Sequence, residues 1–503
     1  MRDKKTKIEV GYCRMHISSS KLFTIVILIC INVINFLGAE LSRFNPIVLN
    51  LLQIELFIIY IFVLYVSIKR YGVYSIKTGF LLTLTLFSLN AVFFTVFGLT
   101  DFGDTALGIQ YFTWETKTKM VIIEYYILFL SVFYSIALSD KVETKENKPL
   151  LELYPNDKAI LLWARRAFYF TYSFAILYSI KYALAVLNIG YVASFQNGVT
   201  MTGPVNFVLK VLYNIFILSF YLICSSEEDG KKFDKCGLLY ISCMAIHFMQ
   251  GSRAAAIIPI LFVLIFRYEV YRKKFNTVAI GIFAVLLIIA MQAMTFIRVG
   301  TTFDYGGLPD TIFNFLKTTA SSLNIAGYYY QYRDLLNINN LPYALEPIVR
   351  VVSIVLFPDI MAKGQNLEMV KMRASLNHQI TYSLSEEYYL SGAGVGSNFI
   401  AEMSEFYFPG VLIGSIIFSL WIVFVSKKIR TSRFIRYFSA LFINQILFAP
   451  RAEMLFDSYT FVKWAFFYVA AVWLLTGKIH LKRGIHGVME GGKLDNAVGG
   501  TYG

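Results

Sequence analysis

Long apolar segments are the feature that most constrains how this chain can fold. A helix needs about 20 apolar residues to cross the hydrocarbon core of a bilayer. Twelve such segments follow one another, and they centre on 22–38, 46–68, 79–99, 120–138, 161–188, 205–224, 236–250, 253–271, 277–297, 397–425, 434–450 and 458–476. The sequence therefore predicts an all-α polytopic membrane protein with about 12 transmembrane helices.

The composition agrees with a membrane protein. Hydrophobic residues make up 57% of the 503 residues and charged residues only 16%, whereas a soluble domain carries about 25% charged residues. The formal net charge of +14 would suit a nucleic-acid partner in a soluble protein. In a membrane protein, basic residues gather in cytoplasmic loops and fix the topology, so we expect a lipid bilayer as the partner and no nucleic acid.

The distribution of basic residues predicts the topology. With the N-terminus inside, alternate connections hold 31 of the 46 Lys and Arg residues, which is the asymmetry expected of cytoplasmic loops. Both termini are then cytoplasmic. The predicted organisation is a cytoplasmic N-terminus over 1–21, nine helices over 22–297, a large outside loop over 298–396, three helices over 397–476 and a disordered cytoplasmic tail over 477–503.

Residues 298–396, which we call the polar interval, are the one long polar stretch in the chain. The segment "LPDTIFNFLKTTASSLNIAGYYYQYRDLL" has helical apolar spacing after a Pro start, and "NLEMVKMRASLN" is a weaker helical candidate. None of the five cysteines falls in this interval, so its order must come from packing. We expect a small, partly helical domain that lies on the outer face of the membrane.

Three arginines break the pattern of basic residues inside. Arg253, Arg298 and Arg451 each fall at the predicted outer end of a helix. The alternative for any one of them is a long side chain that reaches the interface from a lipid-facing position. Three arginines from separate helix ends favour binding of one anionic group, because the planar guanidinium binds phosphate oxygens through two hydrogen bonds. A lipid-linked diphosphate is the anion that fits this place.

Carboxylates near the same face are candidates for acid–base chemistry. Glu402 and Glu405 are three residues apart, so they share a face at the start of the tenth predicted helix. Such acids also suit a helix N-terminus, or can pair with an arginine. The catalytic alternative is a general base that deprotonates a sugar hydroxyl. His378, the one histidine of the polar interval, is a competing base. We find no acidic pair with metal-ligand spacing and predict no metal and no cofactor.

Tyrosines recur in two stretches of the polar interval, "GYYYQYRD" and "SEEYYLSG". A tyrosine offers both a ring face for the C–H groups of a sugar and a hydroxyl for hydrogen bonding. An aromatic belt at the membrane interface would have the same composition. The candidate sugar-binding residues are Tyr328, Tyr329, Tyr330, Tyr388 and Tyr389.

Four features give the chain a family resemblance. They are "QGSRAAAIIPIL", "MTFIRVG", "GAGVGSNFIAEMSEFYFPGVLIG" and the layout of twelve spans with one dominant outside loop. In this combination the chain resembles the Wzy-type polymerases of O-antigen and oligosaccharide repeat units. It departs from the usual ending of the third stretch, because Pro409 precedes the glycine, and this leaves the register of Glu402 against Glu405 open.

The resemblance implies a glycosyltransferase of the bacterial inner membrane with its active site on the periplasmic side. Such an enzyme has a multi-span fold of the C type and transfers a growing glycan from undecaprenyl diphosphate to the non-reducing end of a new lipid-linked unit. By position, Arg253 and Arg298 correspond to the family's diphosphate-binding residues and Glu402 to its acidic residue. A chain-length regulator, or co-polymerase, is an implied partner.

Two other functions share parts of this pattern. An O-antigen ligase has the same architecture and donor, and His378 gives it weak support. A flippase for lipid-linked oligosaccharides is a transporter, for which we would expect short loops and pseudo-repeated halves. The long polar interval and the lack of visible internal symmetry argue against a flippase.

Overall fold

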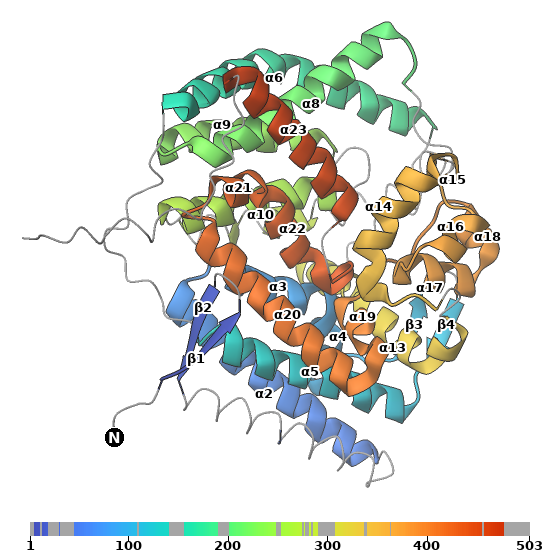
Figure 1. The fold of residues 1–503 in the computed structure, drawn as a ribbon. Helices are drawn as coiled ribbons and strands as arrows, with labels where there is room; N and C mark the ends of the chain where they lie inside the picture. The colour runs from blue at the N-terminus through green and yellow to red at the C-terminus, as the bar shows by residue number, and fades with distance from the viewer. Residues whose placement is uncertain are drawn as a thin grey trace, which may run out of the picture.

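The computed structural model describes residues 5–10, 13–18, 30, 45–107, 110–139, 155–189, 201–247, 253–273, 276, 281–282, 285–289, 307–336, 340–362, 364–454 and 457–476. Helices dominate this part of the chain (Figure 1). Two short antiparallel hairpins, which the prediction of an all-α fold did not include, join β1 to β2 and β3 to β4.

Before the polar interval the elements are β1 Lys5–Val10, β2 Cys13–Ser18, α2 Pro46–Tyr71, α3 Ile76–Leu84, the π-helix η1 Thr85–Leu89, α4 Asn90–Val96, β3 Asp104–Leu107, β4 Gln110–Thr113, α5 Thr116–Ile136, α6 Pro155–Ile189, α8 Pro204–Ser226, α9 Gly230–Ala245 and α10 Arg253–Tyr271. Within the interval they are α12 Leu308–Thr319, α13 Ser322–Tyr332, η3 Arg333–Leu335, η4 Tyr343–Leu345, α14 Glu346–Leu356, α15 Pro358–Ala362, α16 Leu367–Met372, α17 Leu376–Leu384 and α18 Glu386–Leu390. After it come α19 Phe399–Met403, η5 Ser404–Phe406, α20 Tyr407–Lys428, α21 Arg433–Tyr437, α22 Ser439–Phe448, η6 Ala449–Arg451 and α23 Ser458–Thr476.

Seven helices in the described part of the chain are long and apolar enough to cross a membrane. They are Pro46–Tyr71, Ile76–Val96, Thr116–Ile136, Lys158–Ile189, Pro204–Ser226, Phe399–Lys428 and Ser458–Leu475. Each overlaps one of the twelve predicted spans, which confirms the class of membrane protein but not the number twelve. Helices α9, α10 and the broken pair α21–α22 form at three other predicted spans without meeting that standard. The remaining two predictions lie mostly outside the described residues, which include residue 30 of 22–38 and residues 281–282 and 285–289 of 277–297.

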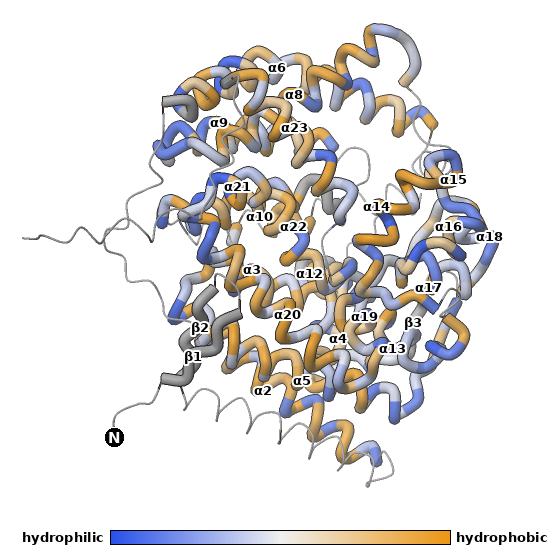
Figure 2. Tube along the Cα trace, viewed as in Figure 1, coloured by the Kyte–Doolittle hydropathy of each residue, from blue (hydrophilic) through white to orange (hydrophobic). Residues whose placement is uncertain are grey.

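Helix α5 forms the centre of the packing. Of the seven long apolar helices it is the most buried, and it packs against α2 on one side and α20 on the other. From Met120 onward Glu124 is its one charged residue and apolar side chains occupy every face, which is typical of a helix that is surrounded by others. Apolar residues run along these helices, as Figure 2 shows for α2, α5 and α20.

The polar interval gathers at one end of the long helices, together with the hairpin β3–β4 (Figure 1). Both predicted helical stretches are confirmed, the first as α12 and α13 and the second as α16. The hairpin holds the interval in place: Gln110 Nε2 donates to Leu384 O at 2.6 Å, and the Phe112 ring lies edge-on to Tyr328 at 4.9 Å. The indole of Trp114 packs closely against Gly327, because a Cβ added at Gly327 would lie 2.3 Å from the indole.

Candidate functional site

Two of the predicted acids line one cavity of about 320 Å³. Glu402 comes from α19 and Glu405 from η5, directly before α20. Glu346, at the start of α14, and Glu453, two residues after η6, line the same cavity. The other lining residues are Tyr343, Ala344, Pro347, Met403, Phe406, Pro409, Gly410, Ile413, Gly414, Ile417 and Met454. Four carboxyl groups therefore share a cavity with mainly apolar walls.

Asn398 fixes the position of α19 and hence of Glu402. It is the N-cap of α19, and its Oδ1 accepts from Ile400 N at 2.9 Å and from Ala401 N at 3.3 Å, which is the usual role of Asn at a helix start. Its Nδ2 lies 3.0 Å from the carbonyl oxygen of Ser322 and 3.2 Å from that of Pro450. The side chain is fully buried, so it joins α13, α19 and η6 at one point.

One or two hydrogen bonds orient each of three of the four carboxylates. For Glu402, Ser397 Oγ donates to Oε1 and Met454 N donates to Oε2, each at 2.7 Å. Tyr343 N donates to Glu405 Oε2 at 2.8 Å. Ser375 Oγ donates to Glu453 Oε1 at 3.1 Å. A carboxylate has about four acceptor positions, so these donors fix its orientation and leave acceptor capacity for other hydroxyl groups.

The fourth carboxyl belongs to a buried chain of polar groups. Glu346 accepts from Arg373 Nε at 2.8 Å, and both side chains are almost fully buried. Arg373 Nη1 lies 2.8 Å from His378 Nε2, and His378 Nδ1 lies 2.9 Å from the hydroxyl of Tyr389. Burial raises the pKa of Glu346 to about 7, although the Arg373 guanidinium opposes that rise.

His378 is held neutral in this chain. Arginine can only donate hydrogen bonds, so Nε2 accepts from Arg373 and the ring proton must be on Nδ1, which then donates to Tyr389. Burial, followed by the charges of Arg373 and Arg350, lowers the pKa of His378 to about 3. Both ring nitrogens are occupied inside the protein. The prediction of His378 as a catalytic base therefore disagrees with the geometry, which gives it a role in packing.

The match to a known family decides the class of protein. The model of the family described as O-antigen polysaccharide polymerase Wzy matches residues 20–482, which is most of the chain. This protein belongs to the Wzy family of O-antigen polymerases. No curated protein and no solved structure gave a significant match. Membership makes the protein a polymerase of the glycosyltransferase type, and the predicted resemblance is confirmed.

Of the three arginines predicted to bind diphosphate in this Wzy polymerase, the structure describes the side chain of one. Arg451, the last residue of η6, is exposed, and its guanidinium lies 5.8 Å from the centre of the Phe87 ring in the π-helix η1. It is two residues from Glu453, on the segment that also contacts Glu402 through Met454. Arg253 begins α10, but its side chain and all of Arg298 lie outside the described residues. The convergence of the three arginines stays a prediction.

Burial corrects part of the predicted sugar site of the Wzy polymerase. Tyr328, Tyr329 and Tyr389 are buried, so their rings pack inside the protein and offer no face to a sugar. Tyr330 and Tyr388 keep partial exposure and remain candidates. Sequence patterns did not point to Arg333, whose guanidinium lies 3.4 Å from the centre of the Tyr407 ring at the start of α20.

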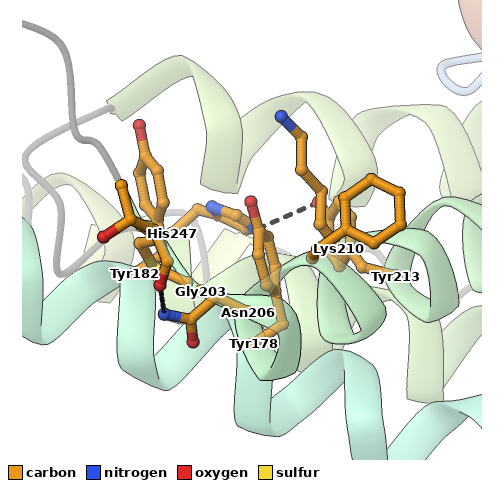
Figure 3. A pocket seen from close by; sticks show the side chains of 10 residues that line it. Tyr178, Tyr182, Gly203, Asn206, Lys210, Tyr213 and His247 are labelled. Atoms are coloured by element: carbon orange, nitrogen blue, oxygen red, sulfur yellow. Dashed lines mark hydrogen bonds between the residues drawn. The ribbon is translucent and has the colours of Figure 1, made fainter.

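A second cavity, of about 720 Å³, lies between α6 and α8 (Figure 3). Its polar groups include Tyr213, whose hydroxyl is 3.0 Å from His247 Nε2, and Asn206, which donates to Thr202 O at 2.8 Å. None of the predicted site residues lines it. Among the described residues, no group of three or more His, Cys, Asp or Glu side chains is arranged to hold a metal ion. The first cavity, which is lined by Glu346, Glu402, Glu405 and Glu453 and which we call the glutamate cavity, is the candidate active site because it holds the predicted acids.

Proposed function

We propose that the protein polymerises undecaprenyl-diphosphate-linked O-antigen repeat units at the periplasmic face of the inner membrane. The growing glycan moves from its lipid diphosphate to a hydroxyl at the non-reducing end of a new lipid-linked unit. The observation that carries this proposal is the position of Glu402 and Glu405, which line one cavity where the polar interval joins a membrane-spanning helix.

The reaction requires one proton acceptor and one charge stabiliser. The bond between the anomeric carbon and the diphosphate oxygen breaks, and a bond from that carbon to the acceptor oxygen forms. The hydroxyl proton passes to a carboxylate acting as general base. Glu402 suits this role because its two oxygens are held at fixed positions by Ser397 and Met454. Glu405, held by Tyr343 N, is the alternative base.

The departing lipid diphosphate carries the charge that develops in the transition state. Fixed cationic groups stabilise such charge most effectively in a site that excludes water. Of the proposed arginines, Arg451 is the one with a described side chain, and Glu453 and Met454, which follow it closely, line the cavity beside Glu402. Arg253 and Arg298 complete the proposed set. The family match favours a polymerase over the ligase and the flippase.

Charge-neutral variants test the site. In a strain without its own polymerase gene, we expect Glu402→Gln or Glu405→Gln to leave lipopolysaccharide with core plus one repeat unit and no ladder. Both variants must be present in the membrane at the wild-type level. Glu386→Gln is the matched control, since Glu386 is exposed on α18 and does not line the cavity; it should give a full ladder.

Two results would contradict the proposal. Normal ladders from both cavity variants would remove these carboxylates from the chemistry. Bare core in a strain that lacks this gene would point to a ligase, because a ligase is needed to attach even one unit.

A further inference from the structure

Helix α14 has an apolar face that the protein does not cover. Its inward positions are polar: Glu346 and Ser353 are buried, and Arg350 pairs with Asp457 at 3.1 Å. Its outward positions are apolar and follow helical spacing, with exposed fractions of 64% for Ile348, 47% for Val352, 70% for Val355 and 62% for Leu356. This reverses the arrangement expected of a helix that faces water.

The surroundings of α14 indicate what covers that face. Its first turn is tied to a membrane-spanning helix, since Ser458 Oγ, at the start of α23, donates to Pro347 O. Helices α14 and α23 pack against each other. Helix α23 exposes Val462 and Phe466, as a lipid-facing helix does. Figure 2 shows α14 as largely hydrophobic and α18, in the same interval, as largely hydrophilic. The apolar face of α14 is therefore next to lipid-facing surface.

The glutamate cavity opens beside this helix. Residues Ala344, Glu346 and Pro347 form one wall, and the α20 residues Ile413 and Ile417 form another. Ile413 and Ile417 are 57% and 47% exposed, so the cavity reaches the lipid-facing side of α20. At 1.5 Å per residue, these side chains lie about 9 and 15 Å along α20 from its first residue, Tyr407. A carboxyl-lined end thus continues into an apolar groove.

We propose that α14 is an interfacial helix with its apolar face in the bilayer, and that the gap between α14 and α20 admits the lipid chain of the substrate from the side. Amphipathic helices of this kind lie in the plane of the membrane surface. The polyprenyl chain occupies the groove at Ile413 and Ile417 while its diphosphate reaches the carboxyl-lined end. The lateral entry of the lipid chain rests on the proposed function. The position of α14 in the bilayer does not depend on that function.

Spin labels test the position of α14 without any need for activity. Cysteines are introduced singly at Val355 and at Leu335, in full-length protein with Cys13→Ser and Cys30→Ser; the other three cysteines are buried. Leu335 is the matched control, because it is 74% exposed in the same interval but lies in η3. In lipid nanodiscs we expect the label at 355 to be open to oxygen and shielded from a water-soluble nickel chelate, and the label at 335 to show the reverse.

Two outcomes would overturn this part of the proposal. Free access of the nickel chelate to position 355, equal to that at position 335, would place α14 in water. Shielding of position 355 from both reagents would show that protein, and not lipid, covers the helix.

A bulky substitution tests the entrance. Ile417→Trp should fill the groove and reduce long-chain polymer at least tenfold at an unchanged protein level. Leu474→Trp is the control, since Leu474 is 73% exposed on α23 and does not line the cavity. A normal ladder from Ile417→Trp, together with a lost ladder from Glu402→Gln, would refute the lateral entrance and leave the proposed function intact.

Discussion

Replacement of Asn398 by aspartate separates a local role from a tertiary one. As helix N-caps, Asn and Asp are almost equivalent, so local structure alone predicts a neutral change. In the folded protein, Nδ2 of Asn398 faces the carbonyl oxygens of Ser322 and Pro450, and the side chain is fully buried. A carboxylate there would place acceptor oxygens against these two carbonyl acceptors, and among the described residues only the hydroxyl groups of Tyr126 at 3.1 Å and Ser88 at 3.5 Å could donate to the oxygen that replaces Nδ2. We therefore expect Asn398→Asp to lower the free energy of unfolding.

The size of the effect follows from the charge. The introduced carboxyl can donate to one carbonyl only when it is protonated. Holding a carboxyl neutral at pH 7, about 3 units above its ordinary pKa near 3.9, costs about 4 kcal/mol at about 1.4 kcal/mol per unit. One of the two Nδ2 hydrogen bonds is lost as well, which adds about 1 kcal/mol. The expected total is at most about 5 kcal/mol at pH 7, because a hydrogen bond from the Tyr126 hydroxyl to the carboxylate reduces the cost of the charge.

The sign of the pH dependence makes this prediction specific. A carboxyl whose pKa is raised in the folded state is least destabilising at low pH and becomes more so as the pH increases. The deficit relative to wild type should therefore shrink between pH 7 and pH 5, by up to about 2.7 kcal/mol. Thermal unfolding in nanodiscs at both values measures this difference.

The matched control is Asn45→Asp. Asn45 caps α2 through Ile47 N at 2.8 Å but is exposed to solvent, so its replacement should change stability by less than about 0.5 kcal/mol. An Asn398→Asp protein that unfolds at the same temperature as wild type at pH 7 would contradict this prediction. A loss of stability that is equal at pH 5 and pH 7 would contradict it as well.

Two more predictions concern packing and titration. Gly327→Ala should destabilise the protein by about 1–3 kcal/mol through overpacking, because the new Cβ would lie 2.3 Å from Trp114. Adding Trp114→Leu to the same chain should restore the melting temperature. If the two substitutions instead lower the stability additively, the contact is disproved. The lowered pKa of His378 means that its contribution to stability is full above pH 6.5 and is lost as the pH falls toward 3. Melting of His378→Gln should accordingly depend less on pH below 6.5 than that of wild type, and equal slopes would contradict a buried neutral histidine.

The sequence by itself determined the class of the protein and much of its local structure. Apolar runs such as Pro46–Tyr71 must become helices in a membrane, because only helices and closed barrels satisfy their own backbone groups there. Apolar periodicity also located α12, α13 and α16, and motif resemblance identified the family. These are properties of short stretches and of composition, so they can be read without a fold.

Tertiary structure decided which of the candidate residues share a site. Glu402, Glu453 and Glu346 line the same cavity only because three segments that are distant in the sequence pack around it. The hydrogen bond of Asn398 to Pro450 O holds two of these segments together. The burial of Tyr328 and His378 depends on neighbours far along the chain, including Phe112 and Arg373. Residue type shows what a side chain is able to do, but long-range packing sets its exposure and its partners, and these decide whether it can meet a substrate.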